Sequence, residues 1–353
     1  MRGRIAFSIF GVLALAGLAL VWSFGCDEKP TDPGEGGPKD YVLYWNRYGD
    51  DSAFFGYHTL TGQIDSFFLP SALIYDMKAS ADGELLYISY RYKISVVRTR
   101  DFKLVADLPY SGFLGVAVSP DNRHIAVQGS NLRILSTTDF SVVFQDTIGV
   151  YRSVFSANGL RLYAPGPESS CPSVYRLDLE HGFRSKITCF PDPYPIRQVA
   201  PSRDEKLLFM FRYLGSCYML FDVFDRCGDS LVFRDLVAPG CGDMVVSHDN
   251  RFVYFTGPGD KHGWPPPAYT FARYGIRDKT VDSLLFWSVC GYDFPTGIIG
   301  HYLTLTPDDR FLAINEPYPH VRVLVFNCQS EDTAKTLCIP GMEFWHLTCQ
   351  NGT

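Results

Sequence analysis

The sequence predicts an all-β fold built from seven repeats of four short strands. Seven times along the chain, a turn of the Ser/Thr-x-Asp/Asn type follows an apolar alternating run, and six of these turns lead directly into a second apolar run. Such turns recur roughly every forty residues, with insertions, which is the signature of a repeat architecture. No long amphipathic helical pattern interrupts them. The acidic or amide residues of the seven turns are Asp82, Asp121, Asn158, Asp204, Asp249, Asp308 and Asn351.

The seven acidic or amide residues are predicted to form turns rather than to catalyse a reaction. Asp and Asn accept hydrogen bonds from backbone N–H groups two residues further on, and a Gly or Asn that follows tolerates positive φ. Seven such groups at equivalent positions point to a repeated structural role.

Each repeat also contains two further strands joined by a polar hairpin. Examples are VVRTRDFKLVADL at 96–108 and ILSTTDFSVVFQD at 134–146, where apolar strand residues flank a polar centre. Four short strands per repeat, rich in β-branched and aromatic residues, are typical of one blade of a β-propeller. Aromatic residues make up 15% of the chain, which suits the layers between blades.

The two ends of the chain are predicted to share one blade. The first set of three outer strands, about 42–70, has no inner strand before it, and the last inner strand, 342–353, has no outer strands after it. Pairing these segments closes the ring and removes the exposed edges of an open stack. The expected fold is therefore a seven-bladed β-propeller of four-stranded antiparallel blades, closed by the C-terminal inner strand.

The turns resemble those of the YVTN-type and WD-repeat-like bacterial β-propellers, whose blades carry a Ser-Pro-Asp-Gly turn before an apolar strand. The matching segments are Ser119-Pro120-Asp121-Asn122 and Thr306-Pro307-Asp308-Asp309. The resemblance covers about residues 42–353 and implies the fold. It implies no single function, because such propellers serve as enzymes, sensors and binding platforms. The Trp-Asp dipeptide of WD-repeat proteins is absent from every repeat.

The first forty residues predict export and attachment to a membrane. Residues 1–25 carry Arg2 and Arg4 before a long apolar stretch, as in a signal peptide. Ser23-Phe24-Gly25-Cys26 resembles a bacterial lipobox, which implies lipidation of Cys26, although the family prefers Leu at position 23 and a small residue at 24. The alternative is an uncleaved anchor helix.

Residues 26–41, rich in Pro, Gly and charge, are expected to form a flexible tether. The expected location is extracytoplasmic, in the periplasm or at the cell surface, as a membrane-anchored lipoprotein.

The net charge argues against nucleic acid as a partner. Loss of Arg2 and Arg4 with the signal peptide changes the formal net charge from −6 to −8, and the chain contains no basic run. Phosphate binding requires concentrated Lys and Arg.

The nine cysteines other than Cys26 also suit an oxidising compartment. Cys171 and Cys189 lie symmetrically about the turn of one hairpin and are the favoured disulfide pair. Cys328 and Cys338 are a weaker candidate pair, because they are less symmetrical about their turn.

The sequence contains no standard catalytic, cofactor or metal signature: no G-x-S-x-G, no P-loop, no H-E-x-x-H and no C-x-x-C. We therefore expect no cofactor. Long loops gather on one side of the predicted ring, opposite the turns, and long loops often carry recognition. Three histidines in them could bind a metal or act as bases, or could simply be solvated. The candidate contact residues in these loops are His262, Trp264, Tyr292, His301, Tyr318 and His320.

The leading functional hypothesis is a tethered binding or scaffold module that contacts a protein or glycan through these loops and acts as a monomer. Tyr and Trp are common in binding hot spots. The resemblance implies an alternative, a lactonase-like or other hydrolase with a site at the mouth of the central channel; no catalytic residue is carried over. A structural subunit of an envelope assembly is a third possibility. The residues expected at the mouth of the central channel are Asp76, Arg152, Arg197, Asp243 and His301.

Overall fold

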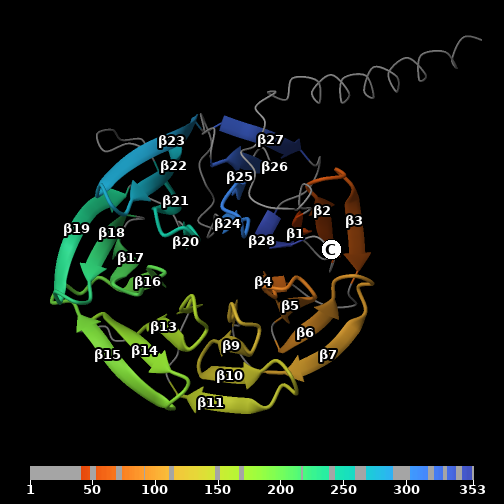
Figure 1. Ribbon diagram of the computed structural model, residues 1–353, viewed down its shortest axis with the longest axis horizontal. Coiled ribbons are helices and arrows are strands. Elements are labelled where there is room, and N and C mark those ends of the chain that lie inside the picture. The colour runs from red at the N-terminus through yellow and green to blue at the C-terminus, as the bar shows by residue number, and fades with distance from the viewer. Residues whose placement is uncertain are drawn as a thin grey trace, which may run out of the picture. The chain divides into compact units, whose positions relative to one another are not determined.

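The computed structural model of the chain is a ring of seven antiparallel blades of four strands each, as the sequence predicts (Figure 1). The structure describes residues 41–47, 53–68, 74–90, 92–110, 115–147, 152–166, 171–215, 218–237, 243–258, 268–288, 303–316, 322–328, 332–338 and 344–351. In each blade the innermost strand is called a and the outermost d. Among these described segments, no helix is long and apolar enough to cross a membrane.

The first four blades follow the repeat order of the sequence. Blade 1 contains, from a to d, β28 (Phe344–Asn351), β1 (Tyr41–Arg47), β2 (Ala53–His58) and β3 (Ile64–Phe68). Blade 2 contains β4 (Ile74–Ala79), β5 (Leu85–Tyr90), β6 (Lys93–Arg98) and β7 (Leu104–Pro109). Blade 3 contains β8 (Gly115–Val118), β9 (His124–Gln128), β10 (Leu132–Ser136) and β11 (Val142–Asp146). Blade 4 contains β12 (Val154–Phe155), β13 (Arg161–Pro165), β14 (Ser173–Asp178) and β15 (Phe183–Cys189).

The remaining three blades repeat the same order. Blade 5 contains β16 (Ile196–Pro201), β17 (Leu207–Gly215), β18 (Tyr218–Asp225) and β19 (Ser230–Val237). Blade 6 contains β20 (Met244–Val246), β21 (Phe252–Pro258), β22 (Ala268–Gly275) and β23 (Thr280–Ser288). Blade 7 contains β24 (Leu303–Leu305), β25 (Phe311–Glu316), β26 (Arg322–Asn327) and β27 (Asp332–Cys338).

The predicted closure of the ring is confirmed. The C-terminal strand β28 pairs antiparallel with β1, from Tyr41 opposite Asn351 to Arg47 opposite Phe344. The first blade is therefore completed by the last strand of the chain. Closure pairs the inner edge of β1, which would otherwise expose a row of unpaired backbone groups.

The hydrophobic core lies between neighbouring blades. Between blades 5 and 6, the rings of Phe221 and Phe255 stack with their centroids 4.9 Å apart. Between blades 6 and 7, Phe271 and Phe326 meet edge to face at 5.1 Å. Offset and edge-to-face arrangements at such distances are the favoured geometries of aromatic pairs. The aromatic richness of the chain is thus used to pack blade against blade.

The a–b turns are held by their own Ser or Thr and Asp or Asn side chains. In blade 2, Ser80 Oγ donates to Asp82 Oδ1 at 2.6 Å, Glu84 N donates to the same oxygen at 3.0 Å, and Leu85 N donates to Ser80 Oγ at 2.9 Å. The same hydroxyl-to-carbonyl or hydroxyl-to-carboxylate contact recurs in five more blades, in the pairs Ser119–Asp121, Ser156–Asn158, Ser202–Asp204, Ser247–Asp249 and Thr306–Asp308. These carboxylates are turn formers.

The residue after each of these Asp or Asn residues has positive φ, and where it is not glycine its side chain reaches back to the preceding blade. Asn122 Oδ1 accepts from Ala81 N at 2.7 Å, and Asn250 Oδ1 accepts from Arg203 N at 2.8 Å. In blade 4 this position is Gly159, where a Cβ atom would lie 2.6 Å from Asp121 Cγ. The positive φ favours glycine at this position, and the close approach excludes a larger residue unless the Asp121 side chain shifts.

Glu205 occupies the same positive-φ position in blade 5, where the sequence pattern favoured Gly or Asn. Its longer side chain reaches blade 4, where it accepts from Arg161 Nη1 at 2.9 Å and from the hydroxyl of Tyr163. These contacts offset the cost of a left-handed backbone at a non-glycine residue.

A β-bulge occurs in strand d of blades 2 to 7, at an equivalent place. In each, the register between strands c and d shifts by one residue. A bulge bends and twists an edge strand, which discourages pairing with another chain. The extra residues are Val105, Val143, Ile187, Val232, Leu284 and Ala334.

Candidate functional site

The ring has two ends. The turn side carries the a–b turns and the c–d hairpins, and the loop side carries the b–c and d–a connections. The lipidation candidate Cys26 and the six predicted contact residues lie outside the described residues, so the structure does not test them; these six are His262, Trp264, Tyr292, His301, Tyr318 and His320.

Two acidic residues expected at the channel mouth are used to join blades. Asp76 accepts from Met77 N and from Val116 N of the next blade, both at 2.8 Å. Asp243 accepts from Met244 N at 2.9 Å and from Leu303 N of the next blade at 3.0 Å. Both carboxylates accept from backbone amides of two blades, and Asp243 Oδ1 also accepts from Gln198 Nε2 of blade 5 at 2.6 Å, so both have a structural role.

Blade 3 makes the same bridge with a residue from another strand. Gly115 occupies the position equivalent to Asp76 but has no side chain, and Gln128 from β9 fills the adjacent space. Gln128 Oε1 accepts from Ser153 N of blade 4 at 2.7 Å, and its Nε2 donates to Ser153 O at 3.3 Å. The bridging function is therefore preserved although the residue that performs it has moved.

No group of three or more His, Cys, Asp or Glu side chains in the described part of the chain is arranged to hold a metal ion. Within the same segments, the described acids at the channel mouth are committed to hydrogen bonds between blades. The candidate binding site lies elsewhere on the loop side, at the junction of blades 4 and 5.

The d–a connection at this junction, residues 190–195, begins at a disulfide. Cys171 and Cys189 are joined, with their Cα atoms 5.5 Å apart. Cys189 pairs with Ser173 rather than with Cys171, so the bridge runs diagonally across the end of the hairpin. Ser173 Oγ donates to Cys171 O at 2.6 Å, and Phe190 N donates to Pro172 O at 3.0 Å.

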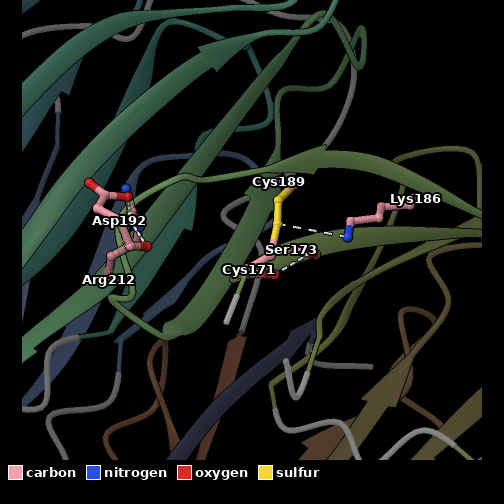
Figure 2. Close-up of a disulfide and its surroundings, with 6 residues drawn as sticks. All are labelled: Cys171, Ser173, Lys186, Cys189, Asp192 and Arg212. Carbon is pink, nitrogen blue, oxygen red and sulfur yellow. Dashed lines mark hydrogen bonds and ion pairs between the residues drawn. A yellow bond between two sulfur atoms is a disulfide. The ribbon is translucent and has the colours of Figure 1, made fainter. Parts of the chain in front are cut away.

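Arg212 of β17 holds the other half of this loop (Figure 2). Its side chain is fully buried, and its guanidinium lies 4.3 Å from the centroid of the Phe190 ring. Nη2 donates to the carboxylate of Asp192 and, at 3.3 Å, to its carbonyl oxygen, while Nε donates to Tyr194 O at 3.4 Å. One guanidinium thus binds both the side chain and the backbone of the loop.

Asp222 and Arg234 complete the network behind Arg212. Asp222 is fully buried and accepts from Arg212 Nη1 at 3.0 Å and from Arg234 Nε at 2.7 Å. Together with Asp192, the network contains two carboxylates and two guanidinium groups, so its negative and positive charges balance. Burial alone would raise the pKa of Asp192, but the hydrogen bond and charge of Arg212, with Arg234, outweigh it and lower that pKa below the ordinary range.

The clamped loop presents a rigid outer surface. Pro191, Pro193 and Pro195 are exposed and alternate with Asp192 and Tyr194, which turn towards Arg212. Proline fixes φ and carries no N–H, so this surface has few backbone conformations open to it.

Beside the loop, exposed Arg197 lies over the ring of Tyr213, with its guanidinium carbon 5.0 Å from the ring centroid. The junction therefore combines rigid apolar groups with a cation held against an aromatic face.

The sequence-based expectations did not include the four charged residues that hold this loop, Asp192, Arg212, Asp222 and Arg234. The available signal is a single charge within an apolar strand: Arg212 follows LLFMF, and Asp222 follows YMLF. Charged residues are almost never fully buried unless they are paired. Opposite charges within two consecutive apolar strands could therefore have predicted a buried pair.

Removal of the disulfide is expected to lower the free energy of unfolding. The bridge spans 18 residues, and a loop of that size gives about 3 kcal/mol by the chain-entropy model. We expect the C171S/C189S variant to lose about this amount in urea denaturation. The exposed free thiol Cys227 provides the matched control, because C227S should not change stability. Equal unfolding midpoints for the double variant and the wild type would contradict this assignment.

Cys328, the weaker disulfide candidate with Cys338, is a free thiol in the structure. It lies in the hydrophobic cluster between blades 6 and 7, and burial raises its pKa to about 11. The thiol is therefore protonated and unreactive at neutral pH.

Comparison with solved structures finds the same fold in bacterial proteins. A functionally unknown protein from Desulfotomaculum acetoxidans aligns with a TM-score of 0.64 at 13% identity, covering 88% of this chain and 99% of that one. A periplasmic gluconolactonase from Pseudomonas aeruginosa gives 0.62 at 17% identity, with coverage of 88% and 99%. A putative 6-phosphogluconolactonase from Bacteroides fragilis gives 0.61 at 12% identity, with coverage of 90% and 99%.

No protein-family model matches the sequence, and no curated protein matches it at a significant level. At these low identities the structural similarities establish the seven-bladed propeller fold and carry no activity to this chain.

Proposed function

We propose that this protein is a membrane-tethered, extracytoplasmic β-propeller that binds a partner through the loop side of its ring. The signal-like residues 1–25 and the lipobox-like segment ending at Cys26 support the tether. The disulfide Cys171–Cys189 supports an oxidising compartment. The protein acts as a monomeric binding module without a cofactor.

One observation carries the binding role: the 190–195 loop is fixed from beneath while its outer surface stays exposed. Burying Arg212 and Asp222 costs desolvation energy, and well-packed apolar residues are often equally stabilising. The particular effect of this network is to hold the loop in one conformation. Preorganisation reduces the entropy lost on binding and so increases affinity.

The chemistry of the junction favours a protein partner over a glycan. The exposed groups are three prolines and Arg197, whose guanidinium lies over the half-buried ring of Tyr213, while the Asp192 carboxylate is already bound to Arg212. Arg and Tyr are frequent hot-spot residues in protein interfaces.

The test places a photoreactive amino acid at Pro193 or Arg197 in cells that produce the full chain. Irradiation should link these positions to one protein partner. The matched control is position 123 on the turn side, where the Arg side chain is 76% exposed, and it should give no such adduct. Equal adducts at all three positions, or none at Pro193 and Arg197, would refute binding through this junction.

Two further measurements test the lipid tether and the alternative hydrolase function. Mass spectrometry should find an acyl-modified Cys26 at the mature amino terminus. A mature chain that begins at Met1 would instead support the uncleaved anchor helix and contradict lipidation. The hydrolase alternative predicts turnover of a sugar lactone by purified protein. The two acids expected at the channel mouth, Asp76 and Asp243, do not favour it, since both are bound to backbone amides.

A further inference from the structure

The chain enters the ring on its turn side. Strand β1 is the b strand of blade 1, and Tyr41 pairs with Asn351, the last residue of the a strand β28. Tyr41 N also donates to Thr59 Oγ1 at 2.8 Å, and Thr59 belongs to the c–d hairpin of the same blade. Both contacts place the first residue of the ring at the end that carries the turns and hairpins.

Exposed apolar side chains collect around this same end. The d strands lie on the outside of the ring (Figure 1). Each runs away from its c–d hairpin, so its first residues lie at the outer rim of the turn side. In blades 1 to 5, these first positions carry large apolar side chains that are 40–51% exposed: Ile64, Leu104, Val105, Val142, Val143, Phe183 and Leu231. We call this set the turn-side rim.

The rim is more than scattered surface hydrophobicity. Single exposed apolar residues are common and need no explanation, but these occupy one structural level in five consecutive blades. In blades 2 and 3 the bulge residues Val105 and Val143 are themselves part of the rim, so the bulge exposes two successive apolar side chains. A strand with regular alternation would expose one and bury the other.

The predicted tether is short enough to bring this rim to a membrane. The segment 27–40 joins Cys26 to Tyr41, and a flexible chain of that length spans roughly 20 Å on average. Tethering at this range gives a high local concentration, so weak contacts that would not bind a free protein become populated.

We propose that the turn-side rim rests on the lipid bilayer, with its apolar side chains in the interfacial layer and the loop side directed away from the membrane. This inference rests on the proposed tether. An uncleaved anchor would give the same orientation, because the chain enters the ring at the same residue. Apolar side chains at one level suit shallow insertion at the boundary of headgroups and acyl chains.

The contact is expected to be apolar rather than electrostatic. Three exposed cations of the a–b turns lie close to a carboxylate: Arg123 to Asp121 at 3.9 Å, Lys206 to Asp204 at 3.5 Å, and Arg251 to Asp249 at 3.9 Å. Paired charges of this kind give little net attraction to anionic lipid. Binding should therefore depend weakly on salt and on the fraction of anionic lipid.

The experiment uses the full-length anchored protein reconstituted into phosphatidylcholine vesicles. A photoreactive amino acid replaces Leu104 or Val143 on the rim, or Arg197 on the loop side as the matched control. After irradiation, mass spectrometry should find phospholipid adducts at positions 104 and 143 and severalfold less at 197. The L104S/V143S variant, tested with the photoreactive residue at Ile64, should lose most of its lipid adduct while remaining anchored.

Three results would overturn the proposal. These are absence of lipid adducts at the rim, equal adducts at the rim and at position 197, and adducts from the rim to a second copy of the chain. Failure of the tether is detected by a separate measurement, vesicle flotation, because a protein without its anchor would not float with the vesicles.

Discussion

Deletion of residues 344–353 is expected to abolish cooperative folding of the ring. The truncated chain lacks β28, so blade 1 would have no inner strand and β1 would expose its edge. Residues 41–44 of β1 are almost fully buried, at 1–3% exposure, and Val42 and Tyr44 belong to the core between blades 1 and 2. Thermal unfolding followed by circular dichroism should show a lost or broadened transition, and the chain should aggregate through the unpaired edge.

The matched control removes only residues 352–353, which follow β28, and should unfold like the full chain. If the chain that ends at residue 343 kept the wild-type transition and stayed monomeric, closure by β28 would not be essential to the fold.

Replacement of Arg212 by Met is expected to cost about 3–5 kcal/mol of unfolding free energy, the usual cost of breaking a buried ion pair by removing one partner. Asp222 would remain fully buried with Arg234 as its charged partner, and the 190–195 loop would lose its bonds at Asp192 and Tyr194. Hydrogen exchange across the loop should rise together with the loss of stability. The exposed Arg197 offers the control, since R197M should leave both measurements nearly unchanged.

The same variant should also alter the dependence of stability on pH. A carboxylate whose pKa is lowered in the folded state stabilises the fold above its ordinary pKa, and this contribution is lost as pH falls through the lowered value. Asp192 is such a group, because Arg212 and Arg234 outweigh the effect of its burial. As pH falls from the ordinary pKa of an aspartate to the lowered pKa of Asp192, the wild type should therefore lose more unfolding free energy than R212M. Parallel pH profiles would contradict the role of Arg212.

The architecture could be predicted from sequence because its signals are local and repeated. The turn at Ser119, Asp121 and Asn122 is held by contacts two to five residues apart, so its chemistry is legible without tertiary information. Even the closure followed from local signals, since it required only a count of strands at the two ends.

The candidate site could not be predicted in the same way, because its contacts join residues from a loop and three strands. Asp192 and Arg212 are 20 residues apart, and Arg234 and Asp192 are 42 apart, with no shared motif. The bridge made by Gln128 is similarly hidden, because it depends on the absence of a side chain at Gly115 in a different strand. Pairings set by three-dimensional packing leave no period in the sequence.

The inner strands are joined to their neighbours in opposite senses at their two ends. On the loop side, Asp76 and Asp243 reach forward to the following blade, while on the turn side Asn122 and Asn250 reach back to the preceding one. Blades 2 and 3 are joined in both senses, by Asp76 to Val116 N and by Asn122 to Ala81 N, so a tilt of one against the other would break one of these contacts and their separation is restrained. A partner that contacts two blades therefore meets two sites at a constant spacing, and it gains avidity only if its own contact sites match that spacing.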